Sequence, residues 1–213
     1  MHFGFPKVYP ILDSSFIPGV GRSEFLRRLG ESFADVDVTL CEYRNKTGSD
    51  FEILTDADVL RKALPQGKVK LILDDRADLV EAAGFDGVHV DAGDLSPIQA
   101  RKLVGQQRIV GTFGGSESLL PGILTAPADY LAVGPVFETR TKHTGKRPIG
   151  IEGVRRLREQ AGPKIVLSAA AGITFESAQS VLDAGASMVA VAEGIFRNDD
   201  PAAEFRRWMQ YLH

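Results

Sequence analysis

Short apolar runs alternate with longer segments of helical period along almost the whole chain. The runs recur about every 20 to 30 residues, which is the spacing expected of successive βα units. Several are continuously apolar, as in parallel strands that are buried on both faces. The predicted strands are Val8–Leu12, Val36–Tyr43, Lys70–Asp74, Gly87–Val90, Ile109–Thr112, Tyr130–Val133, Ile165–Ser168 and Met188–Val191.

The segments between these runs carry helix signals. Ser96 is a predicted N-cap, Pro97 suits the first helical position, and Gly105 follows the expected end. Pro121 and Gly122 oppose a helix interior, so we expect only a short or broken helix between the fifth and sixth strands. The other predicted helices are Glu24–Ala34, Asp56–Ala63, Arg76–Ala83, Ser96–Val104, Glu152–Gln160, Phe175–Ala184 and Pro201–Leu212.

Eight strands that alternate strictly with helices favour a closed barrel, so we predict an α/β fold of the (β/α)8 TIM barrel class. The length of 213 residues suits one such domain, spanning 1–213. A doubly wound sheet is the alternative, but no GxGxxG motif follows the first strand. In a barrel, the functional site belongs at the carboxyl ends of the strands.

Charge and cysteine content indicate which classes of partner to expect and which to exclude. A formal net charge of -3 gives no overall field that would favour nucleic acid or an acidic membrane surface. The single cysteine, Cys41, fits a reducing compartment, and no apolar run is long enough to span a bilayer. We therefore expect a cytoplasmic protein with small-molecule ligands and no nucleic-acid or membrane partner.

Two acids follow the third and fourth predicted strands. Asp75 and Asp94 can face one cavity from neighbouring strands, and two carboxylates with water and a phosphate suffice for a Mg²⁺ site. The alternative is that both residues cap the helices that follow them.

Basic and hydroxyl side chains lie at the same predicted edge. Arg44 and Lys46 share one strand face because residues i and i+2 point the same way. Thr139, Thr141 and Lys142 lie on a long loop, where hydroxyls and a lysine suit phosphate oxygens. The alternative for this loop is an ordinary solvated surface.

The seventh and eighth loops are the places where barrels often bind phosphate through backbone N–H groups. Gly172 and Gly194 fit that use, whereas the carboxylate of Glu193 would repel a phosphate unless it turned away. We interpret His89 as a buried, hydrogen-bonded histidine at a strand end.

Six motifs in this order resemble those of one superfamily, which comprises thiamine phosphate synthases and thiazole tautomerases. The resemblance runs from Tyr9 to about Phe196. The motifs are VTLCEYRNK, LILDDRADL, GFDGVHVDAGDLS, ADYLAVGPVFETRTK, PIGIEGV and AGITFESAQSVLDAGASMVAVAEGIF.

The resemblance implies a (β/α)8 barrel that joins a pyrimidine methyl diphosphate to a thiazole phosphate and releases pyrophosphate. It implies that Asp75 and Asp94 bind Mg²⁺, which would be the cofactor. Residues implied at the phosphorylated substrates are Arg44, Lys46 and Lys142 around the diphosphate, and Thr139, Thr141 and Gly172 at the thiazole phosphate.

Other positions depart from the family pattern, and they cluster where substrate is expected. The family has Gln at Glu42, Asn at Asp74, Ser at Phe113, Gln at Ala92, Gly at Ala171 and Ile-Ser at Ala192–Glu193. We therefore treat Glu42, Asp74, Phe113, Ala192 and Glu193 as substrate-binding positions that have changed. Two unit charges ~4 Å apart repel by roughly 4 kcal/mol at an effective dielectric near 20, so the new carboxylates should weaken polyanion binding.

The sequence leaves three alternative functions open: a thiamine phosphate synthase, a diverged barrel with another phosphorylated ligand, and a non-catalytic paralogue. The tautomerase branch is disfavoured, because its acid/base histidine corresponds to Gly115 and no histidine lies in Gly111–Tyr130. A homo-oligomer is possible, since Phe205 and Trp208 on the last predicted helix form either a surface patch or a seal on the barrel.

Overall fold

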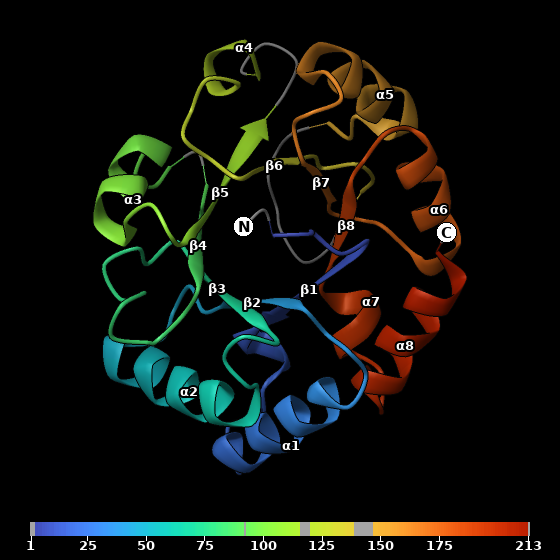
Figure 1. Ribbon diagram of the computed structural model, residues 1–213. Coiled ribbons are helices and arrows are strands. Elements are labelled where there is room, and N and C mark those ends of the chain that lie inside the picture. Colours follow the sequence, from blue (N-terminus) through green and yellow to red (C-terminus); the bar gives the residue numbers. More distant parts are fainter. Residues whose placement is uncertain (1–2, 92, 116–119, 139–146, 213) are drawn as a thin grey trace.

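The computed structural model describes residues 3–91, 93–115, 120–138 and 147–212. Eight parallel strands pair in sequence order and close into a barrel, with the longer helices outside it (Figure 1). This confirms the predicted (β/α)8 fold. The strands are β1 Val8–Asp13, β2 Leu40–Arg44, β3 Lys70–Asp74, β4 Gly87–Val90, β5 Ile109–Gly115, β6 Tyr130–Val133, β7 Leu167–Ala170 and β8 Met188–Val191.

Most predicted helices are present, and their caps explain their bounds. Ser96 and Gln99 form a capping box before Pro97, as predicted. Ser49 accepts a hydrogen bond from the backbone of Glu52, so α2 begins six residues earlier than predicted. The helices are a short 3-10 turn at Ser14–Phe16, then α1 Arg22–Ala34, α2 Asp50–Ala63, α3 Pro97–Val104, α4 Leu120–Ile123, α5 Gly150–Ala161, α6 Phe175–Asp183, α7 Glu193–Phe196 and α8 Pro201–Tyr211.

One predicted helix is wrong, and three strands have bounds that differ from the prediction by two or more residues. The segment 76–83 forms successive turns instead of a helix. Asp75 adopts a left-handed φ of 63°, and the backbone N–H groups that follow bond to carbonyls two, three or four residues back, without the regular i to i−4 pattern of a helix. The second strand begins at Leu40 and not at Val36. The fifth strand ends at Gly115, three residues later than predicted. The seventh strand is Leu167–Ala170, two residues later than predicted. The short helix α4 agrees with the expected break at Pro121 and Gly122.

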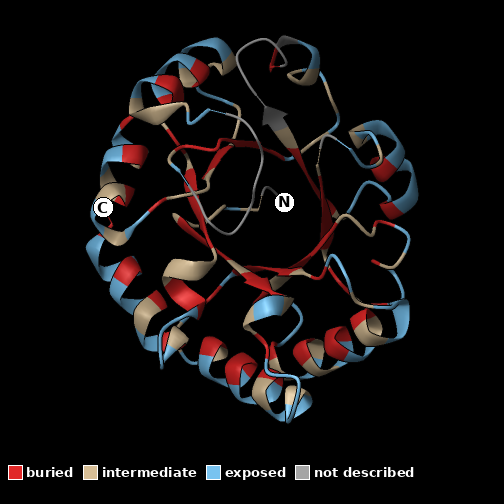
Figure 2. Cartoon of the chain, turned by 180° about the vertical axis from the view of Figure 1, so that it is seen from behind, coloured by how far each residue is buried: buried red, intermediate tan, exposed pale blue. Residues whose placement is uncertain are grey.

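The core has two parts. One fills the space between the strands and the inward faces of the helices, and the other lies inside the barrel (Figure 2). At the amino ends of the strands, the ring of Phe5 packs on that of Tyr130 with centroids 5.6 Å apart. Phe205 and Trp208 are each 1% exposed, so they seal the barrel and form no surface patch. No helix within the described ranges has the length and apolar character needed to cross a bilayer.

Three arginines recur at equivalent places between helices and strands. Arg61 in α2, Arg101 in α3 and Arg158 in α5 each donate to two or more backbone carbonyls beyond their own helix. Each also donates to a side chain that in turn accepts the backbone N–H of an odd-numbered strand. Asp86 accepts from Arg61 at 2.7 Å and from the backbone N–H of Leu71. Asp129 accepts from Arg101 at 2.6 Å and from the N–H of Val110. Ser187 accepts from Arg158 at 2.9 Å and from the N–H of Leu167.

Candidate active site

A cavity of about 690 Å³ occupies the carboxyl end of the barrel, and side chains from all eight strands line it. Alternation along each strand directs every second residue inward. On β2 these residues are Glu42 and Arg44. The predicted i, i+2 pair was Arg44 and Lys46, but β2 ends at Arg44, so Lys46 lies beyond the strand. The cavity therefore lies where the barrel rule places a functional site.

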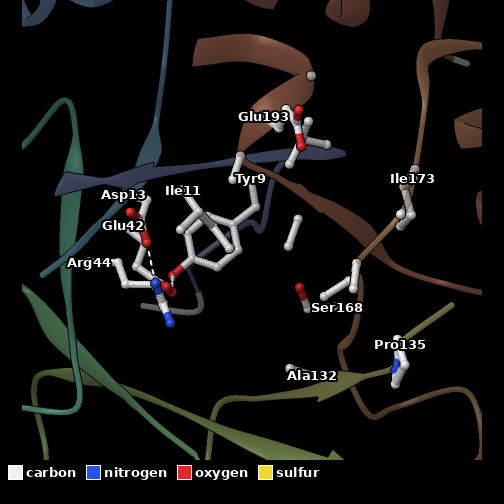
Figure 3. A pocket seen from close by; sticks show the side chains of 18 of the residues that line it. Tyr9, Ile11, Asp13, Glu42, Arg44, Ala132, Pro135, Ser168, Ile173 and Glu193 are labelled. Carbon is white, nitrogen blue, oxygen red and sulfur yellow. Dashed lines mark hydrogen bonds and ion pairs between the residues drawn. The ribbon is translucent and has the colours of Figure 1, made fainter. Parts of the chain in front are cut away.

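The wall of this cavity has two unlike halves. Acids and bases come from β1 to β4, and we call this the charged half: Asp13, Glu42, Arg44, Asp74 and His89. The opposite wall, from β6 to β8, consists mainly of small side chains, and we call Ala132, Ala170 and Ala190 the alanine patch. Figure 3 shows Glu42 and Arg44 across the cavity from Ala132 and Ser168.

The two predicted bases are held by carboxylates. Arg44 contacts Asp13, and its Nε lies 3.4 Å from Asp74 Oδ2. The Nζ of Lys46 lies 2.9 Å from Asp74 Oδ2 and also contacts Asp75. Burial disfavours the charged form of Lys46, but Asp74 and Asp75 outweigh it and raise the pKa of Lys46. Both bases are therefore cationic, and both are already paired with acids.

A group of acids lies beside these bases. Oxygen atoms of Asp74, Asp75 and Asp91 lie within 4.8 Å of one another. Burial raises the pKa of Asp75, and contact with the Asp94 carboxyl raises it further. Asp75 Oδ1 is buried, and no hydrogen-bond donor in the described part of the chain reaches it. Such a set of oxygen atoms suits a hard divalent cation.

The structure thus brings the predicted pair Asp75 and Asp94 into contact. No helix follows Asp75, so the alternative that it is a helix cap is wrong. Asp94 accepts the backbone N–H of Asp91 at 2.9 Å, while Ser96 caps the next helix. Asp91 was not among the predicted ligands, although it directly follows β4 at the same edge of the barrel.

A chain of hydrogen bonds crosses the floor of the cavity. The Tyr9 hydroxyl donates to Glu42 Oε2 at 2.6 Å and lies 3.0 Å from the Tyr130 hydroxyl. The Tyr130 hydroxyl lies 3.1 Å from Nδ1 of His89. Glu42 is 3% exposed, and this burial raises its pKa to about 7. His89 is 8% exposed, which agrees with its interpretation as a buried, hydrogen-bonded residue.

The loops after β7 and β8 complete the wall. Gly172 has a φ of 71°, and a Cβ there would lie 2.5 Å from the carbonyl oxygen of Glu138, so only glycine fits. Ala171 also has a left-handed φ, of 73°. The Glu193 carboxylate pairs with Arg197 at 2.8 Å, which compensates part of its charge. Phe113 and Ala192 both line the cavity.

The predicted phosphate contacts Thr139, Thr141 and Lys142 lie outside the described residues. Sequence reasoning also missed Tyr9, Tyr130 and Ser168 as lining residues. Their inward positions follow from the alternation along β1, β6 and β7, but the sequence does not say which of the two alternating sets of a fully buried strand faces inward.

Comparison with known proteins gives consistent matches. Residues 8–195 match the family described as Thiamine monophosphate synthase. A thiamine-phosphate synthase of Koribacter versatilis is 40% identical over 208 residues, which are 98% of this chain and 96% of that protein. One from Agrobacterium fabrum is 37% identical over 162 residues, 75% of this chain and 74% of that protein. The structure of a thiamine phosphate pyrophosphorylase from Pyrococcus furiosus superposes with a TM-score of 0.79 at 27% identity, covering 97% of each chain.

Proposed function

Because this chain belongs to the thiamine monophosphate synthase family, we propose that it joins a pyrimidine methyl diphosphate to a thiazole phosphate. The products are thiamine phosphate and pyrophosphate. One observation supports this reaction above the others. Arg44 and Lys46 lie beside a group of carboxylates at one side of the cavity, while small apolar side chains form the other side.

The diphosphate is the leaving group of this reaction, and the charged half of the cavity has to stabilise it as it departs. Negative charge builds up on the diphosphate as its bond to the pyrimidine methylene carbon breaks, so fixed cations nearby lower the barrier. Arg44 and Lys46 are positioned for this role, and we assign them to the diphosphate together with Lys142. The resulting pyrimidine cation is captured by the thiazole nitrogen, which forms the new carbon–nitrogen bond.

Mg²⁺ fits the acids described above. Asp75 and Asp94 would hold it, with Asp74 and Asp91 beside them. When bound, the ion would neutralise charge on the departing diphosphate. Lys46 contacts Asp75, so the cation and the metal ligands would act together on the diphosphate end of the substrate.

The changed substrate positions each have a local compensation. Asp74 is paired with Lys46 and Arg44, Glu193 is paired with Arg197, and the raised pKa of Glu42 leaves part of it neutral near pH 7. Asp74 therefore competes for the cations of the site, and the three acids add less free negative charge than their number suggests. This arrangement is compatible with binding of a polyanion.

The direct test is to incubate the purified protein with both phosphorylated substrates and Mg²⁺, and to follow thiamine phosphate and pyrophosphate. We expect both products in equal amounts. Lys46→Met should lower kcat by roughly 100-fold, as loss of a fixed transition-state cation does. Lys62→Met is the matched control, because Lys62 is 75% exposed on α2 and pairs with the exposed Asp58.

Absence of product at high enzyme concentration would contradict the proposal. Calorimetry with Mg²⁺ and pyrophosphate then separates the two other functions. Binding without turnover would indicate a diverged barrel with another phosphorylated ligand. Lack of binding would indicate a non-catalytic paralogue.

A further inference from the structure

Ser168 is the polar side chain that the proposed function leaves unexplained. It lies in the middle of β7, is 1% exposed and lines the cavity. Its Oγ has no hydrogen-bond partner among the residues that the structure describes. A buried hydroxyl without a partner is destabilising, so its presence at this position calls for a partner from outside the chain.

The surroundings of Ser168 supply no such partner. The neighbouring wall is the alanine patch, whose methyl groups neither donate nor accept hydrogen bonds. The Tyr130 hydroxyl, which also lines the cavity, already lies within hydrogen-bond distance of Tyr9 and His89. Figure 3 shows Ser168 on the wall across the cavity from Glu42 and Arg44.

The two halves of the cavity suit the two ends of a phosphorylated heterocycle. Arg44 and Lys46 attract the phosphate end to the charged half. The flat, apolar face of an aromatic ring can then lie on the alanine patch. The edge of such a ring carries nitrogen atoms, and a hydroxyl can donate to a ring nitrogen or accept from an amino group.

We propose that Ser168 is a specificity-determining residue whose hydroxyl binds a ring nitrogen or amino group of a heteroaromatic substrate resting on the alanine patch. This inference rests on the proposed function, because it assigns Ser168 to a ring of one of the two substrates. A site built around such a bond discriminates against a ring that lacks the polar atom, since the hydroxyl is then left buried and unpaired.

The test is Ser168→Ala, measured by calorimetry with the pyrimidine diphosphate and the thiazole phosphate titrated separately. We expect the Kd of one of the two to rise about three- to tenfold, the value of one neutral hydrogen bond, and the Kd of the other to stay unchanged. The substrate that loses affinity is the one whose ring Ser168 contacts.

The stability of the unliganded protein provides a second readout that a structural hydroxyl would not give. Ser168→Ala removes an unpaired group, so its thermal midpoint should equal or exceed that of the wild type. Ser187→Ala is the matched control, because the Ser187 hydroxyl bonds Arg158 and the backbone of Leu167. It should lower the midpoint and leave both Kd values unchanged.

The outcomes separate this inference from the proposed function. If the wild type binds both substrates and Ser168→Ala binds them equally well, the role of Ser168 is refuted and the proposed function stands. If the Ser168→Ala midpoint falls as that of Ser187→Ala does, the hydroxyl is structural and the inference is again refuted. If the wild type binds neither substrate, the proposed function is wrong and this inference fails with it.

Discussion

The hydroxyl of Tyr9 donates a 2.6 Å hydrogen bond to Glu42 inside the barrel, where the glutamate is 3% exposed. The two residues come from neighbouring strands, since β1 pairs with β2 through Ile11 and Glu42. One bond from a neutral hydroxyl does not replace the hydration that the carboxylate loses on burial. Folding therefore favours the protonated form of Glu42.

This predicts a pH-dependent stability that Glu42→Gln should abolish. Burial raises the pKa of Glu42 from 4.5 to about 7, so the folded protein retains a proton that the unfolded chain releases. Stability from this group is complete below pH 4.5 and falls as the pH rises toward 7 and above. At pH 8 the Gln variant should be more stable than the wild type by about 3 kcal/mol, and at pH 4 the two should be equal.

Urea unfolding across this pH range measures the difference. Asp58→Asn is the control, because Asp58 is an exposed acid on α2 whose removal should not change the pH profile. A difference between wild type and Glu42→Gln that stayed constant at all pH values would show that folding does not shift the pKa of Glu42.

Asp74→Asn should tighten the binding of pyrophosphate. Asp74 lies 2.9 Å from Lys46 and 3.4 Å from Arg44, and a neutral amide would leave each cation with one acid partner in place of two. We expect the Kd for pyrophosphate to fall about tenfold, which corresponds to roughly 1.4 kcal/mol. Calorimetry in EDTA keeps metal affinity out of the measurement. An unchanged or weaker affinity would refute the idea that Asp74 competes for these cations.

The barrel itself could be predicted because its signals are local. Continuous apolar runs, caps and glycine stops predicted all eight strands, and the position of barrel sites at the carboxyl ends of strands indicated Glu42 and Arg44 as site residues. The seventh strand was placed two residues early, because Ala169 and Ala170 after Ser168 are too small to look like a buried run.

The charge partners in the site could not be predicted in the same way. Lys46 meets Asp74 and Asp75 across two strands, and the distances depend on barrel closure and side-chain reach. The failure of the predicted helix 76–83 has a similar origin. Asp75 has a left-handed φ that its residue type only weakly indicates, and this conformation directs the chain into turns.

Asp75→Asn should weaken the response to Mg²⁺. Asp75 lies in the group of acids, and one of its buried oxygens has no donor among the described residues, so a neutral amide would remove charge where the cation is expected. The Mg²⁺ concentration for half-maximal activity should rise at least about tenfold, since even outer partners of metal ligands have effects of that size.

Asp78→Asn provides the control for this measurement. Asp78 is an acid in the same connection, but it is exposed and pairs with Arg76. Its removal should leave the Mg²⁺ response unchanged. Equal responses of the Asp75 and Asp78 variants would argue that the metal binds elsewhere.

Ala171→Gly should stabilise the protein. Ala171 has a φ of 73°, where an L-residue with a Cβ is strained by roughly 1–2 kcal/mol, and glycine is not. The higher entropy of glycine in the unfolded chain offsets part of this gain, so we expect about 0.5–1 kcal/mol from denaturant unfolding. Ala169→Gly, on the fully buried neighbouring strand position, should destabilise instead. A loss of stability in Ala171→Gly would show that this φ carries no strain.

The three recurring arginines lead to a final prediction. Arg61 and Arg101 each meet an aspartate, whereas Arg158 meets the neutral hydroxyl of Ser187. Burial accordingly lowers the pKa of Arg158, because the partner brings no opposite charge. Ser187→Asp would give the third arginine the same charged partner as the other two, and a carboxylate can also accept the N–H of Leu167.

We expect Ser187→Asp to raise the free energy of unfolding at pH 7 by about 1–2 kcal/mol, the range of hydrogen bonds to charged groups. Ser187→Asn is the matched control, since it has the same size and no charge and should be close to neutral. The gain requires an ionised aspartate whose folded pKa is depressed by Arg158, so it should be lost as the pH falls below about 4. If the Asp and Asn variants unfold at the same denaturant concentration at pH 7, the missing charge is not what limits this third arginine.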